Sequence, residues 1–350
     1  MEKKTKYIFL SNGYRGGATT FIHQHIEFLL KKRKKVILID DNPLATFGKL
    51  NNQLEVNKIN VSVSNKESQK KIYKIFNSGK EKKILFITNY AFIIKYFFLL
   101  RNFKRNKNII ILTLHSGIFN LTLKGFLLGM LFSILYKYID FIFFGSNTAK
   151  NWWLSKYPWM KIKKCPIFYN GTKVNYNLKP RKLKKKLNIS FVGRLVKEHD
   201  PLFFIDIANE YFLKNTNTVF NFFGDGPLLK YLKKNSFSKK ILFHGWCDKK
   251  TIYKKSDLLI VTSPVNNFAY VALEAKSHGI PVISCSKGDI KKIIKNNYDG
   301  IIKYTKSPKK MVNLINIILR NYKSFSKNSI KRSKKFEVNF ACEKLWRNLK

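Results

Sequence analysis

The sequence has few acidic residues, few cysteines and few long apolar runs. Only 20 of its 350 residues are Asp or Glu, against 68 Lys and Arg, which gives a formal net charge of +48. Such a balance bears on partners and not on the fold, because the summed field of the protein attracts anions. Two interpretations remain open: a solvated lysine coat, to which base-composition bias contributes, and a surface that binds an anionic partner.

Cysteine is too scarce to form a disulfide framework. Four are present: Cys165, Cys247, Cys285 and Cys342. They show neither C-x-x-C nor zinc-type spacing, which suggests a reducing compartment. The N-terminus lacks the apolar run of a signal peptide. The apolar stretch 125–136 is well below the ~20 residues that span a membrane, so we expect a cytoplasmic protein without a transmembrane segment.

Short apolar, β-rich runs alternate with helical patterns along the chain. The first series of predicted strands comprises residues 6–11, 36–40, 84–88, 109–115 and 140–146. The second series comprises residues 189–193, 220–224, 241–245, 257–263 and 281–285. The β-α-β rhythm predicts α/β domains with doubly wound parallel sheets.

A basic run with a proline, residues 179–186, interrupts this rhythm and resembles a linker. At about 150 residues per domain, the length leaves room for two domains. We therefore predict one domain over residues 1–180, a second over 181–335, and a closing helix over 336–350.

A glycine-rich segment, residues 11–18, lies between the first predicted strand and a helix. Its glycines, among them Gly16 and Gly17, allow backbone N–H groups to approach an anion at a helix start. The segment has neither the Walker A ending nor the dinucleotide fingerprint. A phosphate cradle and a plain tight turn both remain open.

Polar side chains of the second half follow predicted strands. Arg194 and His199 come just after the run 189–193, and the guanidinium fork of arginine fits phosphate oxygens. Glu274 lies in an otherwise apolar helical stretch, where a carboxylate needs a partner. That partner is either a ligand hydroxyl or a nearby lysine.

These segments, in this order, resemble a retaining GT-B glycosyltransferase of glycosyltransferase family 4 (glycosyl transferases group 1). The matching pieces are the early Gly-Gly loop, the strand ending at His115, Asn170-Gly171, Gly193-Arg194-Leu195, residues 224–228, residues 273–275 and residues 279–283. The resemblance covers nearly the whole chain and is strongest over residues 190–300. It implies two Rossmann-like doubly wound domains that face each other across a cleft.

The resemblance also implies roles for individual residues. Arg194 would meet the diphosphate, Glu274 would accept hydrogen bonds from the donor ribose, and His115 would face the transferred sugar. Gly16 and Gly17 would let the N-terminal loop close on the phosphates. Further donor contacts would come from Asn267, Phe268 and Ala269.

Two positions depart from the family pattern. Asn266 stands where the family has the first acid of its E-x7-E motif, and His199 stands where it has a lysine. An amide carries no charge, and a neutral imidazole gives a leaving group less charge than an ammonium. These departures keep open a non-catalytic GT-B subunit that binds a glycan or a partner enzyme.

The implied reaction moves a sugar from a nucleotide-sugar, such as a UDP- or GDP-sugar, to an acceptor hydroxyl with retention of configuration. Fixed donors would stabilise charge on the leaving diphosphate, and no metal or other cofactor would be needed. The expected pathway is synthesis of cell-envelope polysaccharide, lipopolysaccharide or glycolipid.

The partners expected are the nucleotide-sugar donor and a glycan or lipid-linked acceptor. The stretches 92–105 and 125–132 combine aromatic, apolar and basic residues, and an apolar helix face flanked by lysines can lie in a membrane interface. We expect peripheral attachment to an anionic inner membrane face; the alternative is that these helices simply pack on the sheet.

The high positive charge also suggests a nucleic-acid-binding protein as a rival. No nucleic-acid-binding motif supports it, and we expect no nucleic acid as a partner.

Overall fold

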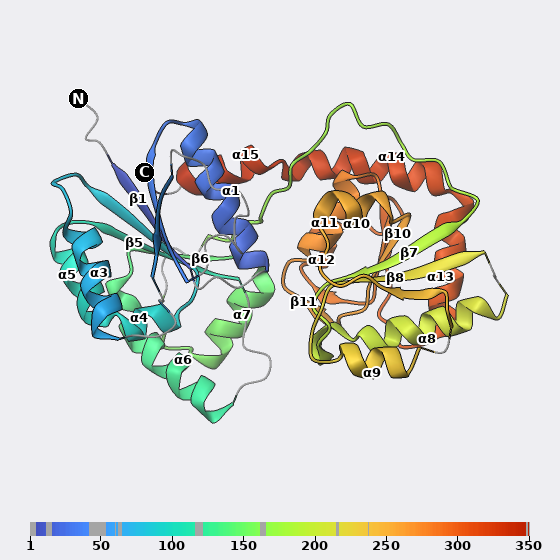
Figure 1. The fold of residues 1–350 in the computed structure, drawn as a ribbon, viewed down its shortest axis with the longest axis horizontal. Coiled ribbons are helices and arrows are strands. Elements are labelled where there is room, and N and C mark those ends of the chain that lie inside the picture. Colours follow the sequence, from blue (N-terminus) through green and yellow to red (C-terminus); the bar gives the residue numbers. More distant parts are fainter. Residues whose placement is uncertain are drawn as a thin grey trace. The chain divides into compact units, whose positions relative to one another are not determined.

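The computed structural model describes residues 5–11, 16–41, 54–59, 61, 65–115, 122–161, 166–214, 217–236, 238–347 and 349. The chain divides into two compact units, unit 1 with residues 1–170 and 339–350 and unit 2 with residues 171–338 (Figure 1). The first boundary between the units lies after residue 170, earlier in the sequence than the predicted boundary at residue 180. Most of the predicted closing helix belongs to unit 1. Residues 12–15 of the glycine-rich segment, and Cys165, lie outside the described residues.

The described part of unit 1 contains a six-stranded parallel sheet in the order β3-β2-β1-β4-β5-β6. Its strands are β1 (Lys6–Leu10), β2 (Lys35–Asp40), β3 (Leu54–Lys58), β4 (Lys83–Ile87), β5 (Ile109–Leu114) and β6 (Phe141–Phe144). Its helices are α1 (Gly17–Lys31), α3 (Lys66–Asn77), α4 (Ala91–Lys95), α5 (Phe97–Arg105), α6 (Leu123–Leu135), η1 (Tyr136–Tyr138), α7 (Asn147–Lys156) and the closing α15 (Val338–Arg347). In the register, Ile8 of β1 lies opposite Ile37 of β2 and Leu85 of β4.

Unit 2 repeats this arrangement with the order β14-β12-β10-β7-β8-β9 among its described residues. Its strands are β7 (Leu187–Val192), β8 (Thr218–Phe223), β9 (Ile241–Phe243), β10 (Leu258–Val261), β12 (Val282–Ser284) and β14 (Gly300–Ile302), with a small parallel pair of β11 (Val265–Asn266) and β13 (Lys287–Gly288). Its helices are η2 (Lys197–His199), α8 (Pro201–Phe212), α9 (Leu229–Lys234), α10 (Lys249–Lys254), α11 (Tyr270–Ser277), α12 (Ile290–Ile293), α13 (Pro308–Arg320), α14 (Tyr322–Ser333) and η3 (Lys334–Phe336).

Both faces of each sheet are buried, which explains the continuous apolar runs of the strands. In β10, Ile260 belongs to one core of unit 2, while Leu259 and Val261 belong to the core on the opposite face. Alternate residues of a strand point to opposite faces, so a strand covered by helices on both sides needs apolar residues at every position. The prediction of Rossmann-like doubly wound sheets is confirmed.

In each six-stranded sheet, the order of the strands reverses at the centre. The order reverses between β1 and β4 in unit 1 and between β7 and β10 in unit 2. Ligands of open α/β sheets bind at the carboxyl ends of the strands beside such a reversal. The loops after β1, β4, β7 and β10 are therefore the places to look for a site.

Among the described residues, no helix combines the length and the apolar character needed to cross a membrane.

Candidate functional site

In unit 2, the loops after β7 and β10 are joined to each other by hydrogen bonds. The hydroxyl of Thr262 donates to the backbone oxygen of His199 at 2.7 Å. The Nδ1 atom of His199 lies 3.1 Å from the hydroxyl oxygen of Ser263. These contacts bring the predicted residues Arg194 and His199 next to the segment that leads to Glu274, at the reversal of the strand order.

The loop after β7 is also held against the loop after β8. The backbone N–H of Leu195 donates to the oxygen of Asp225 at 2.9 Å. A Cβ atom at Gly224 would stand 1.9 Å from the oxygen of Gly193, and Gly224 has a φ of +138°. Glycine is therefore required there for the close approach of the two backbones. This packing fixes the turn that carries Arg194.

The side chain of Arg194 is exposed and makes no hydrogen bond or ion pair with another described residue. Its guanidinium therefore has all its donors available for an anion, and bidentate binding of phosphate is the geometry that it favours.

His199 is held as a neutral imidazole. Burial lowers its pKa, with Glu198 raising it and Arg194 lowering it by smaller amounts. A neutral ring offers one N–H donor and no full charge. His199 is therefore a polar contact beside Arg194 and not a second cation.

Glu274 lies buried in α11, with both carboxylate oxygens bonded. The hydroxyl of Tyr253 donates to Oε2 at 2.8 Å, and the ammonium of Lys249 donates to Oε1 at 2.5 Å. Burial, followed by the nearby carboxylate, raises the pKa of Tyr253 well above its usual value, so the phenol stays a donor. The lysine partner that the sequence left open is present, and the role of Glu274 toward a donor ribose stays a prediction.

The segment between β10 and α11 carries the remaining residues predicted for unit 2. Asn266 lies in β11, where its backbone oxygen accepts from the N–H of Asp289 at 3.2 Å. The side-chain oxygen of Asn267 is buried and has no hydrogen-bond partner among the described residues. Phe268 and Ala269 directly precede α11, and Ala269 is buried. An unsatisfied buried oxygen has a cost that a ligand donor would remove.

The residues predicted for unit 1 follow β1 and β5. His115 comes directly after β5, with its Nε2 atom 3.1 Å from the Thr113 hydroxyl and its ring 5.0 Å from that of Phe21. Burial lowers the pKa of His115 to about 4, so the ring is neutral at pH 7. Gly16 caps α1 and Gly17 begins it, and a Cβ at Gly16 would meet open space. The structure thus groups these three in unit 1 and the other predicted residues in unit 2.

Two partners of Glu274 were not singled out from the sequence, namely Lys249 and Tyr253 of α10. Neither forms a motif, and Lys249 lies in a run of lysines like many others. Only the packing of α10 beside α11 marks them.

The comparisons with known proteins bear on the family and the fold. Residues 175–336 match the family model of glycosyl transferases group 1. A UDP-Gal:alpha-D-GlcNAc-diphosphoundecaprenol alpha-1,3-galactosyltransferase of Escherichia coli is 33% identical over 122 residues, which cover 32% of this chain and 31% of that protein. The match thus spans about a third of the length of this curated relative.

Solved structures match nearly the whole chain. Anabaena HepE in complex with UDP and glucose has a TM-score of 0.79 at 13% identity, covering 98% of this chain and 99% of that one. The pneumococcal O-GlcNAc transferase GtfA in complex with UDP and GlcNAc has a TM-score of 0.76 at 11% identity, covering 99% of each chain. The chain therefore has the GT-B fold, as predicted. Together with the matched domain, this supports a GT-B glycosyltransferase as its class.

Proposed function

We propose that the protein is a glycosyltransferase that moves a sugar from a nucleotide-sugar donor to an acceptor hydroxyl with retention of anomeric configuration. The observation that carries the proposal is the cluster in unit 2. Arg194 and His199 follow β7, Glu274 lies in the helix after β10, and hydrogen bonds join the two loops at the reversal of the strand order. A relative that uses a UDP-sugar matches part of this chain.

In this proposal, unit 2 supplies positive groups to the leaving nucleoside diphosphate. Negative charge grows on the diphosphate as the glycosidic bond breaks, and preorganised donors lower the barrier. The free guanidinium of Arg194 binds the phosphates, and the N–H of His199 donates one further hydrogen bond. Backbone and side-chain groups of Asn266, Asn267, Phe268 and Ala269 contact the sugar or the phosphates.

Glu274 would bind the donor ribose in exchange for its lysine partner. The side chain of Lys249 is 58% exposed, whereas that of Glu274 is only 11% exposed, so water can solvate the ammonium group when it leaves the carboxylate. A ribose hydroxyl can therefore replace the ammonium at Oε1, while the buried Tyr253 keeps its bond to Oε2.

The proposal includes catalysis without a metal, because the cationic side chain of Arg194 and the amides that begin α11 would neutralise the phosphates. Gly16, Gly17 and His115 would serve the phosphates and the transferred sugar from unit 1. We expect turnover to be unchanged by EDTA, and a loss of turnover restored by Mg²⁺ or Mn²⁺ would contradict this part.

The acceptor we propose is a glycan or a lipid-linked sugar used in cell-envelope polysaccharide, lipopolysaccharide or glycolipid synthesis, at the inner face of a membrane. The relative from Escherichia coli is named for a diphosphoundecaprenol-linked acceptor, which supports this class. A non-catalytic subunit is the second candidate. It is favoured by the uncharged Asn266, by the neutral His199 and by the ion pair that Lys249 already forms with Glu274.

A donor screen separates these candidates. We expect at least one UDP-, GDP- or ADP-sugar to raise the melting temperature of the protein and to be hydrolysed or transferred. Arg194→Ala should lower the rate by about 10²–10³, and Glu274→Gln should weaken donor binding while keeping an acceptor for Tyr253.

Matched controls are Arg320→Ala, an exposed arginine at the end of α13, and Glu210→Gln on α8. Both should behave as the wild type. Donor binding without any turnover would favour the non-catalytic subunit. Unchanged turnover in both Arg194→Ala and Glu274→Gln would overturn the proposed site.

A further inference from the structure

Helix α6 of unit 1 exposes an apolar face that no described residue covers. Leu123 is 75% exposed and Ile134 59% exposed, and the face between them is also accessible. Its members are Leu123, Leu127, Met130, Leu131 and Ile134. Their spacing of three, four and seven residues places them on one side of the helix. Figure 1 shows α6 at the periphery of unit 1, beside α4.

The opposite face of α6 is fixed in the core, so the exposed face cannot turn inward. The ring of Phe132 lies 5.4 Å from that of Trp153 and 5.6 Å from that of Tyr90. A Cβ at Gly129 would stand 2.0 Å from the hydroxyl of Tyr157, so this side chain already fills the space against the helix. A helix that is apolar all round is normally buried, and this one has a cover on one side alone.

Amphipathic aromatic side chains border the exposed face. Trp159 is 50% exposed, and its indole N–H donates to the hydroxyl of Ser133 on α6 at 2.9 Å. Tyr138, exposed in η1, has its ring 5.0 Å from that of Phe97, which in turn contacts the exposed Phe98 of α5. Tryptophan and tyrosine are the side chains enriched where hydrocarbon meets water in a membrane.

Basic residues complete the rim. Lys124 and Lys137 are exposed at the two ends of the helix, and Arg101 and Arg105 are exposed on α5. Residues 123–138 contain no acid. The neighbouring Asp140 is already paired with Lys104 at 3.1 Å. The border of the apolar face therefore carries a positive charge.

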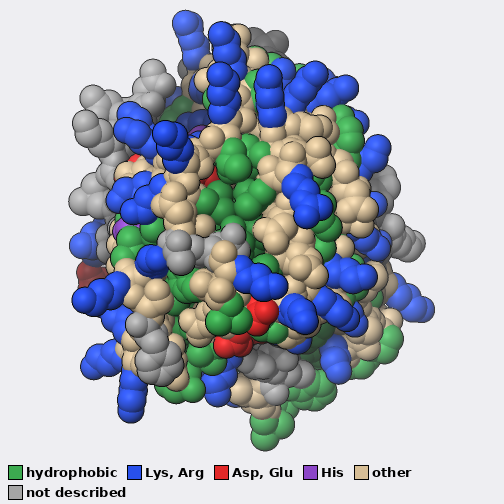
Figure 2. Space-filling view, turned by 90° about the vertical axis from the view of Figure 1, so that its right-hand side faces the viewer, with side chains coloured by type: hydrophobic (Ala, Val, Ile, Leu, Met, Phe, Trp, Pro, Cys, Tyr) green, Lys and Arg blue, Asp and Glu red, His purple; other side chains and the backbone are tan. Residues whose placement is uncertain are grey.

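We propose that the α6 surface, defined as the five apolar residues of α6 with Trp159, Tyr138 and Phe98 at its border, docks on a membrane containing anionic lipid. The apolar side chains enter the interface, and the rim of Lys and Arg binds lipid phosphates. A second copy of the chain is a poorer occupant, because each copy carries +48 and basic side chains are also distributed over the face drawn in Figure 2. This inference does not depend on sugar transfer, since docking needs neither donor nor acceptor.

Vesicle co-sedimentation tests the proposal. The wild type should bind vesicles that contain both phosphatidylglycerol and phosphatidylcholine. Its affinity for vesicles of pure phosphatidylcholine should be lower by about tenfold or more. The triple variant Leu127→Gln, Leu131→Gln, Ile134→Gln should lose about tenfold or more in affinity for the anionic vesicles. Its melting temperature should be unchanged, because all three side chains are exposed.

The matched control replaces three exposed apolar residues of unit 2, Leu213→Gln, Leu242→Gln and Ile317→Gln, and should bind like the wild type. Equal loss in both triple variants, or no binding of the wild type at low salt, overturns the docking surface. A wild-type dimer in solution that the α6 variant dissolves would identify a second copy as the occupant and also overturn it. Donor hydrolysis measured on the same samples reports separately on the proposed function.

Discussion

At the scale of single residues, His25 in α1 is unusually constrained. It is 2% exposed, and its Nδ1 atom has no hydrogen-bond partner among the described residues. Its ring lies 4.2 Å from that of Phe21 and 6.0 Å from that of Trp346. Burial, and to a smaller extent the nearby His115, lowers the pKa of His25 to about 3. The fold therefore accepts only the neutral ring.

This makes stability depend on pH in a definite direction. The unfolded chain takes up a proton on His25 near pH 6.5, whereas the folded protein takes it up only near the lowered value. Stability is therefore full above about pH 6.5 and falls as the pH falls below it; at about pH 5 the loss from His25 is about 2 kcal/mol. Urea unfolding at about pH 7.5 and about pH 5 measures this effect. Between these two pH values, the free energy of unfolding of His25→Phe should fall by about 2 kcal/mol less than that of the wild type.

The control for this prediction is Thr20→Ala on the same helix, a half-buried position whose side chain does not titrate. It should keep the pH dependence of the wild type. A His25→Phe variant that still loses as much stability on acidification would disprove the assignment.

The sequence predicted the candidate site of unit 2 as a set of loops, but not the contacts within it. Arg194 and His199 follow a continuous apolar run, so their place after a strand could be foreseen. That Lys249 pairs with Glu274 could not, because 25 residues separate them and the contact depends on how α10 packs. The family resemblance gave roles to residues; only coordinates show which partners they hold.

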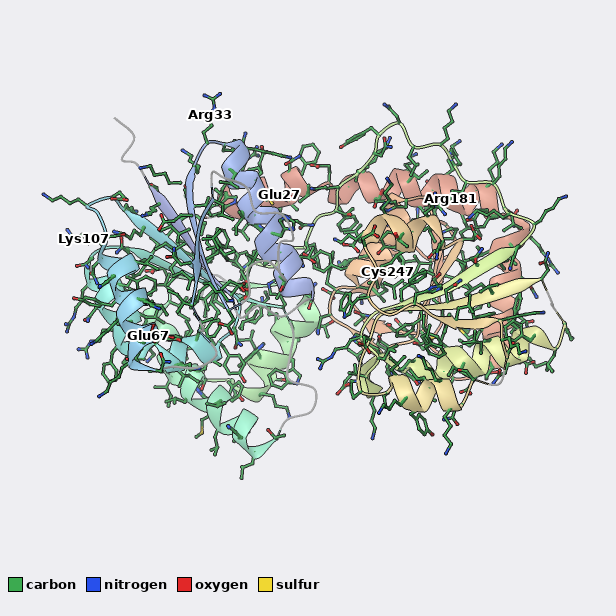
Figure 3. The ribbon with its side chains drawn as sticks, in the orientation of Figure 1. Glu27, Arg33, Glu67, Lys107, Arg181 and Cys247 are labelled. Carbon is green, nitrogen blue, oxygen red and sulfur yellow. The ribbon has the colours of Figure 1, made fainter. Side chains whose placement is uncertain are left out.

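At the scale of elements, Arg181 ties together two helices of the candidate site. Figure 3 labels the side chain of Arg181 in unit 2. Its guanidinium donates to the backbone oxygens of Tyr253 at 2.6 Å, Ser256 at 2.6 Å and His278 at 2.8 Å. These oxygens lie at the carboxyl-terminal ends of α10 and α11, which leave carbonyls unpaired and favour a cation. The basic run interpreted as a linker therefore contains an anchor of unit 2.

Removing this anchor should destabilise unit 2. Arg181→Met leaves three carbonyl oxygens without donors, and we expect a loss of about 3 kcal/mol in the free energy of unfolding. Arg181→Lys should recover only part of it, since an ammonium cannot reproduce the planar fork. The measurement is urea unfolding of the full chain.

Arg320→Met, at an exposed arginine of α13, is the control and should stay within about 0.5 kcal/mol of the wild type. If Arg181→Met were equally stable, the three hydrogen bonds would not hold α10 and α11 in place.

Most strands of the two six-stranded sheets could be predicted from the sequence; the two-residue strands β11 and β13 could not. The predicted runs coincide with strands that carry apolar side chains at most positions, including the edge strands β6 and β9. The strands β3 and β14, which were not predicted, are edge strands of their sheets. β3 reads LEVNK and β14 has only three residues. An edge strand has one neighbour and does not need a continuous apolar run; β6 and β9 have one and were predicted, whereas β3 is interrupted by polar residues and β14 is short.

At the scale of the whole molecule, helix α15 packs against strands β1 and β4, which come much earlier in the sequence. Helix α15 starts at the border of unit 2 and belongs largely to unit 1. The ring of Trp346 lies 5.1 Å from that of Tyr7 on β1 and 4.9 Å from that of Phe86 on β4. Unit 1 thus depends on residues more than 300 positions apart in the sequence.

We expect Trp346→Ala to weaken unit 1 by about 3 kcal/mol, because the large ring leaves a cavity beside two aromatic strand residues. Hydrogen exchange should quicken in peptides of β1 and β4 and stay unchanged in peptides of unit 2. Phe340→Ala, an exposed position of the same helix, should change neither. Equal acceleration in both units would show that they unfold together.

The chain enters and leaves unit 2 at a single hydrogen-bonded spot. The backbone N–H of Thr172 donates to the oxygen of Phe336 at 2.8 Å, and that of Val338 donates to the oxygen of Thr172 at 3.1 Å. Adjacent entry and exit points are what allow one domain to be inserted into another. In evolutionary terms, residues 171–338 form a cassette. Recombination at its two ends can exchange the half proposed to choose the donor while the other half keeps its chain path.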